Sequence, residues 1–193
     1  MIFNGISIAG SAENKLLGVF DRVGTSPNEL AKIVTIGAAG FYSISYQSFN
    51  ALHNNLNIYR NTDMALSENH LLNYTTEAGM VFFNDKNYFV LKATDPELAR
   101  EILLPAQKIS SEIRGITVYS SENLPEFSRI LTPLLTPGKM DYFVWLDNFL
   151  VFAEAPEALE PIISNFLNNS TLWEQEYYTE ASKNLAGASS LLM

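Results

Sequence analysis

Two segments of this chain resemble each other closely enough to constrain its fold. Residues 87–99 read NYFVLKATDPELA and residues 148–159 read NFLVFAEAPEAL, with one residue deleted before the proline. Each copy begins with an apolar run typical of a buried strand, and continues with Pro-Glu, which is typical of the first turn of a helix. The same strand-to-helix connection is therefore expected twice.

The apolar patterns and turn signals divide the chain into three α+β units, over residues 1–76, 77–138 and 139–193. The first two units read strand, strand, helix, strand, helix, and the third is truncated. We expect mostly antiparallel sheets with helices packed on one face, in one continuous domain or two closely packed globular domains. Strands are expected at residues 2–9, 16–21, 40–46, 79–84, 88–93, 115–119, 140–146, 149–154 and 188–193.

Local signals predict where the helices begin. Ser26 to Glu29 and Thr171 to Glu174 both have the spacing of a capping box, and a helix is expected from Thr171 to about Leu185. Further helices are expected from about Ser48, from residues 94–97 and 123–126, and over 156–168. Pro161 lies inside the last of these, so it should kink that helix or delay its regular start.

Both ends of the chain have the pattern of a strand. Residues 2–8 read as a strand from the outset, and residues 190–193 read as a strand just beginning. Natural termini are usually polar and frayed, so we expect the chain to be a fragment of a larger protein.

Composition argues against several classes of function. The net charge is -9, with 21 acidic and 12 basic residues and no Lys/Arg cluster, which argues against a nucleic-acid partner. The absence of cysteine removes disulfides and thiolate metal sites, and no run is apolar enough to span a bilayer. His53, expected on a helix surface, and His70 have no neighbours at metal-ligand spacing, so we predict no metal, no cofactor and no catalytic residue.

The acidic residues allow two interpretations. Glu29, Glu97, Glu126 and Glu174 occupy helix starts, where acids are normally structural. A carboxylate pair that performs hydrolysis stays open, because such pairs are defined by their separation in space.

An aromatic cluster near the C-terminal end is the strongest candidate for a contact with a partner. It consists of Trp173, Tyr177 and Tyr178, and Trp173 and Tyr177 would share one helix face. Tryptophan and tyrosine are favoured at binding surfaces. The alternative is that they anchor this helix to the sheet.

The C-terminal stretch resembles the bacterial DUF3352 family of unknown function. The resemblance is carried by residues 149–159 (FLVFAEAPEAL), 169–172 (NSTL) and 188–192 (ASSLL). The opening residues 4–7 and the strand at 40–43 are also similar to long relatives from Bacteroidota. The resemblance implies an extracytoplasmic protein (periplasmic or cell envelope), held at the membrane only through an anchor upstream of Met1, with no known catalytic residues.

These observations favour a non-enzymatic extracytoplasmic interaction or scaffold module that binds a protein or an envelope component. The alternative is a carboxylate-dependent hydrolase or carbohydrate-active enzyme with a site at the interface of the units. That alternative predicts a cleft that holds at least two acids with raised pKa values. A small-ligand carrier would instead need a sizeable apolar cavity lined by the aromatic residues.

Overall fold

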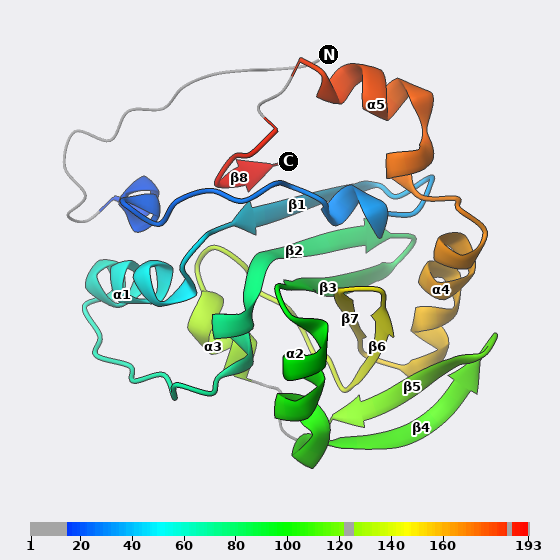
Figure 1. The fold of residues 1–193 in the computed structure, drawn as a ribbon, viewed down its shortest axis with the longest axis horizontal. Coiled ribbons are helices and arrows are strands. Elements are labelled where there is room, and N and C mark those ends of the chain that lie inside the picture. Colours follow the sequence, from blue (N-terminus) through cyan, green and yellow to red (C-terminus); the bar gives the residue numbers. More distant parts are fainter. Residues whose placement is uncertain (1–14, 122–125, 185–186, 193) are drawn as a thin grey trace.

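The computed structural model describes residues 15–121, 126–184 and 187–192, and the predicted strand at 2–9 and the helix start at 123–125 lie outside them. Within the described residues, eight strands form one sheet in the order β4-β5-β6-β7-β3-β2-β1-β8 (Figure 1). All neighbouring strands are antiparallel, which confirms the α+β class and the antiparallel sheet. The strands are β1 (Gly40–Ser45), β2 (Thr75–Phe83), β3 (Lys86–Ala93), β4 (Gln107–Ile113), β5 (Ile116–Ser121), β6 (Tyr142–Leu146), β7 (Phe149–Ala153) and β8 (Leu191–Leu192).

The helices connect these strands. The α-helices are α1 (Phe49–Arg60), α2 (Pro96–Leu103), α3 (Glu126–Leu131), α4 (Glu160–Leu167) and α5 (Glu176–Ser182). Short 3-10 helices are η1 (Leu16–Phe20), η2 (Leu30–Lys32), η3 (Leu71–Tyr74), η4 (Leu104–Ala106), η5 (Pro156–Leu159) and η6 (Leu172–Glu174). The sheet takes strands from all three predicted units, and the boundary predicted between residues 76 and 77 falls inside β2.

The two similar segments lie side by side at the centre of the sheet. They form β3 and β7, which pair with Val90 opposite Val151. These two valines occupy equivalent positions in the two copies. The pairing is therefore symmetric about them, with Phe89 opposite Phe152 and Leu91 opposite Leu150.

Helices cover both faces of the sheet, whereas the sequence led us to expect them on one. The α1 face of the sheet packs against α1, α2 and α3, through apolar residues such as Leu52, Leu103 and Phe127. The α4 face packs against η2, η5 and α4, through residues such as Leu30 and Ile163.

The single deleted residue accounts for this difference. β3 ends at Ala93, which belongs to the core of the α1 face, and β7 ends at Ala153, which belongs to the core of the α4 face. Each helix begins with a proline three residues later, at Pro96 and Pro156. Because successive strand residues point to opposite faces, a one-residue deletion sends the second helix to the other side of the sheet.

Pro161 has the predicted effect on the helix that follows β7. Residues 156–159 form η5, and regular α4 begins only at Glu160, with the proline in its first turn. There its missing N–H removes no helical hydrogen bond. The prediction of a delayed regular start is confirmed.

The strand predicted at 16–21 is wrong, because this segment forms η1. The side-chain amide of Asn55, on α1, donates to the carbonyl oxygens of Val19 (3.1 Å) and Asp21 (2.8 Å). These bonds satisfy backbone acceptors that the sequence assigned to a sheet, and they hold the segment against a helix.

The capping box predicted at Ser26 is also wrong. Ser26 donates its hydroxyl to the backbone carbonyl of Tyr46 (3.0 Å), and Pro27 forms an isolated β-bridge. Helix η2 starts only after Glu29, whose side chain forms ion pairs with Lys32 and Lys92.

Candidate binding site

The aromatic patch predicted from the sequence, Trp173, Tyr177 and Tyr178, lies on two helices where one was expected. Trp173 belongs to η6, and the two tyrosines belong to α5. Between them Gln175 has an extended backbone (φ -88, ψ 127), so Trp173 and Tyr177 do not share a helix face. Trp173 contacts Tyr178 instead, with ring centroids 6.5 Å apart.

The chain bends at this point because its preceding residues are tied to another segment. The backbone N–H of Leu172 donates to the carbonyl of Val34 (2.7 Å), and Thr171 forms a β-bridge with Thr35. Thr171 has no side-chain capping bond to η6, so the capping box predicted there is wrong. Tertiary backbone pairing has replaced the local cap.

Two members of the patch are well exposed. The exposed fraction is 38% for Trp173 and 62% for Tyr177, whereas Tyr178 is half-buried. Leu167 and Ile36, on the neighbouring segments, are exposed at 42% and 40%. The backbone N–H of Ile36 donates to the carbonyl of Ser170 (3.2 Å), which holds these segments together. The anchoring interpretation therefore suits Tyr178, while Trp173 and Tyr177 are accessible to a partner.

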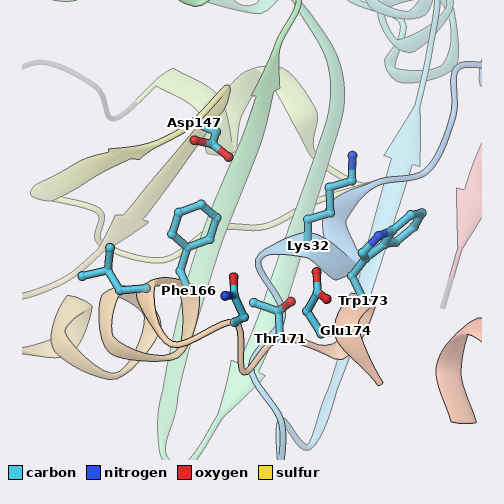
Figure 2. A pocket seen from close by; sticks show the side chains of 8 residues that line it. Lys32, Asp147, Phe166, Thr171, Trp173 and Glu174 are labelled. Atoms are coloured by element: carbon cyan, nitrogen blue, oxygen red, sulfur yellow. The ribbon is translucent and has the colours of Figure 1, made fainter. Parts of the chain in front are cut away.

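A pocket of about 410 Å³ opens beside Trp173. We call it the Trp173 pocket, and Figure 2 shows its side chains. Asp147 lies in the turn between β6 and β7, on the same side as the Phe166 ring, and Lys32, Trp173 and Glu174 lie on the opposite side. The residues that line it are Lys32, Asp147, Phe166, Leu167, Asn169, Thr171, Trp173 and Glu174.

Lys32 joins the pocket to a polar cluster on the α4 face. Its ammonium nitrogen lies 2.7 Å from a carboxylate oxygen of Glu29 and 5.2 Å from the centroid of the Trp173 ring. Lys92, on β3, pairs with the other oxygen of Glu29. Burial acts to raise the pKa of Glu29, but the bonds and charges of the two lysines outweigh it, so this pKa lies below its ordinary value.

Glu77 is the buried member of this cluster, and sequence reasoning missed it. Its side chain on β2 accepts hydrogen bonds from the hydroxyl of Ser43 (2.7 Å) and from the backbone N–H of Glu29 (2.8 Å). The residue is 0% exposed, and burial raises the pKa of its carboxyl despite these bonds. An acid inside an apolar run was the available signal, but the predicted strand began only at residue 79. Glu77 therefore fixes the start of η2, and with it Lys32.

The other candidate residues lie apart from this site. His53 is buried, although its position in the sequence predicted a surface residue, and its Nε2 lies 2.8 Å from the carbonyl of Met64. The helix-start acids Glu97 and Glu126 are exposed on α2 and α3. Among the described residues, no three His, Cys, Asp or Glu side chains gather as a metal site. No helix in the described part of the chain is long and apolar enough to cross a membrane.

A second pocket, of about 380 Å³, lies beside the β2–β3 turn. It is lined by Asp85 and Lys86 from the β2–β3 turn, by Lys139, and by Glu154 and Ala158 beyond β7. Lys139 pairs with Asp141 at 2.6 Å, and this bond raises the pKa of Lys139. The second pocket has no aromatic residue in its lining, unlike the Trp173 pocket.

Comparison with protein-family models, with curated proteins and with solved structures finds no significant match to this chain. The resemblance to DUF3352 therefore stays a prediction.

Proposed function

We propose that this chain is a non-enzymatic interaction module that binds a protein partner through the aromatic patch and the Trp173 pocket. The observation that carries the proposal is the exposure of Trp173, which lines the pocket, and of Tyr177 on the adjacent α5. Aromatic residues of this kind supply much of the energy at protein interfaces, because they bury large areas at little entropic cost. Leu167 and Ile36 extend the apolar surface around them.

The electrostatic arrangement supports binding over hydrolysis. The alternative, a carboxylate-dependent hydrolase or carbohydrate-active enzyme, predicts two acids with raised pKa values in one cleft. Among the described acids, only Glu77 has a clearly raised pKa, and it lines neither pocket. Its hydrogen bonds to Ser43 and to the backbone of Glu29 give it a structural role.

A duplicated architecture is the second part of the proposal. The succession β1-α1-β2-β3-α2-β4 would correspond to β5-α3-β6-β7-α4-β8. Under this correspondence the sheet order reads the same from either edge, with β3 and β7 at its centre. The similarity of residues 87–99 and 148–159 and the symmetric pairing of Val90 with Val151 support it. A rigid sheet of this kind would serve as a scaffold that presents the patch.

An extracytoplasmic location is the third part, and it rests on the family resemblance alone. Protease treatment of intact cells and of spheroplasts that express the full-length protein tests it. Cleavage only after the outer envelope is opened supports a periplasmic location. Protection in spheroplasts would contradict it.

Site-specific photo-crosslinking in the native host tests the binding surface. Benzoylphenylalanine replaces Tyr177 in the full-length protein, and in a control it replaces Ile58, which is 66% exposed on α1. A discrete adduct is expected at position 177 only, and Trp173→Ala should abolish it. The partner identified from that adduct is then purified and titrated, and Trp173→Ala should weaken its affinity at least about tenfold. Equal adducts at both positions, or an unchanged affinity, would overturn the proposal.

A further inference from the structure

The charged groups that line the Trp173 pocket leave an uncompensated negative charge. Asp147 and Glu174 are exposed, and neither forms an ion pair with any residue that the structure describes. Lys32 is the basic residue of the lining, and its ammonium group is already paired with Glu29. A cationic group that enters the pocket would therefore meet two free carboxylates and a neutralised lysine.

Thr171 supplies a second, independent indication of a polar ligand. This residue is only 4% exposed and lines the pocket. Its hydroxyl neither caps η6 nor bonds to any other group in the described part of the chain, whereas its backbone carbonyl accepts from the backbone N–H of Glu174 (3.2 Å) and from the side-chain amide of Gln175 (3.4 Å). The hydroxyl oxygen is not fully enclosed by protein atoms, so a ligand donor that enters the pocket can reach it.

The apolar side of the pocket suits a long basic side chain. The Phe166 ring lies on the same side as Asp147 (Figure 2). An aliphatic stem can pack on such a ring while the charged head reaches the carboxylates, and a planar guanidinium can also stack on it. Trp173 already has one cation against its ring, that of Lys32, so the environment favours positive charge.

We propose that the Trp173 pocket receives an arginine side chain of the protein partner, an inference that rests on the proposed function. Asp147 and Glu174 accept hydrogen bonds from the guanidinium, Thr171 accepts another through its hydroxyl oxygen, and Phe166 packs on the stem. Arginine fits better than lysine, because its planar fork can bond two separate acceptors at once.

Titration of the protein with blocked amino acids tests this proposal for the pocket without the partner. Binding is monitored through the backbone-amide and indole NMR signals. The probes are N-acetyl-arginine methylamide and its neutral isostere N-acetyl-citrulline methylamide. The arginine probe is expected to shift the Trp173 indole signal and the backbone signals of Asp147, Phe166 and Thr171. Equal shifts with citrulline, or no shifts at the pocket with arginine, would overturn the proposal.

Charge-removing variants sharpen the test. Asp147→Asn keeps the residue compatible with its positive φ of 50°, since asparagine tolerates that conformation. Glu174→Gln removes the other charge. Each single variant should weaken the affinity for the arginine probe about threefold, and the double variant should weaken it about tenfold. Glu68→Gln, at an exposed acid away from the pocket, is the matched control and should change nothing. Unchanged affinity in the double variant would refute the arginine assignment.

The two proposals can fail separately. A partner crosslinked at position 177, together with no effect of the arginine probe, refutes the arginine pocket and leaves the interaction module standing. Binding of the arginine probe with no crosslinked partner supports the pocket chemistry and refutes the interaction module.

Discussion

Gly79→Ala should destabilise the protein strongly, because Leu30 of η2 packs directly on Gly79. A Cβ atom at this position would lie 2.6 Å from Leu30 Cδ2, 2.6 Å from the backbone oxygen of Tyr42 and 2.9 Å from Ser43 Cβ. Carbon atoms in contact normally lie about 3.5–4.0 Å apart. Three contacts would therefore be short by roughly an ångström, and one of them involves a backbone atom that cannot rotate away.

The magnitude follows from the cost of overpacking. One extra methyl in a well-packed core costs about 1–3 kcal/mol, and the backbone contact favours the upper end of that range. Replacing glycine recovers about 0.5–1 kcal/mol, because alanine restricts the unfolded chain. We expect a net loss of about 2 kcal/mol in the free energy of unfolding. Lys32 should move with η2, so the fluorescence of Trp173 should also change.

Urea unfolding, followed by circular dichroism, measures this loss. Gly40→Ala is the matched control, because it also lies in a strand and a Cβ there would have no neighbour within 4 Å. It should keep the wild-type stability or gain up to about 1 kcal/mol. Adding Leu30→Ala to Gly79→Ala should cost less than the sum of the two single changes, since it removes one of the short contacts. A Gly79→Ala variant within about 0.5 kcal/mol of wild type would refute the reasoning.

Three further predictions concern the polar cluster and the α1 face. Glu77→Ala should lower the free energy of unfolding by about 1–3 kcal/mol in urea, because the backbone N–H of Glu29 loses its acceptor. Burial raises the folded-state pKa of Glu77, so its protonated carboxyl contributes stability that is present at low pH and is lost as pH rises through that pKa; the deficit of Glu77→Ala should be larger at about pH 4 than at about pH 7. The pKa of Glu29 is lowered, so the stability that this group contributes should fall as pH drops through its folded-state pKa. Glu77→Ala removes the opposing contribution of Glu77, so its free energy of unfolding in urea should fall as pH drops, and a rise would contradict this prediction. Arg100→Ala should remove the cation 4.7 Å from the Trp145 ring, costing about 0.5–1 kcal/mol and changing Trp145 fluorescence; unchanged emission would count against that contact.

The central strands could be predicted because their side chains carry the information. β3, β6 and β7 are apolar on both faces, and every residue of β7 is buried. The strand at 40–46 was recognised by its alternation, and it forms β1 with a shift of one residue at its end. Burial of this kind leaves a pattern in the sequence.

β4 could not be predicted, because most of its side chains are exposed. The residues at its centre are exposed, including Ile109 at 76%, so no apolar alternation marks the strand. It is held by backbone pairing with β5, with a bulge between Ile109 and Ser111. Backbone hydrogen bonds are the same for all residues except proline and therefore leave no compositional signal.

The candidate site could be predicted only in part, for a related reason. The sequence singled out Trp173, Tyr177 and Tyr178 because aromatic residues clustered on one expected helix stand out locally. Lys32 and Asp147 reach the same pocket from distant parts of the chain, through the pairing of residue 172 with residue 34 and through the β6–β7 turn. Contacts between segments so far apart depend on topology, which local pattern does not determine.

The difference between the two similar segments matters for the site as much as their similarity does. Because one residue is missing before Pro156, η5 and α4 pack on the α4 face, while α2 packs on the other. The end of α4 then brings Phe166 to the segments that contain Lys32 and Trp173. Restoring the missing residue between Phe152 and Ala153 should turn α4 towards the α1 face and remove one wall of the pocket. The two similar segments thus form the centre of the sheet, and the position at which they differ places one wall of the Trp173 pocket.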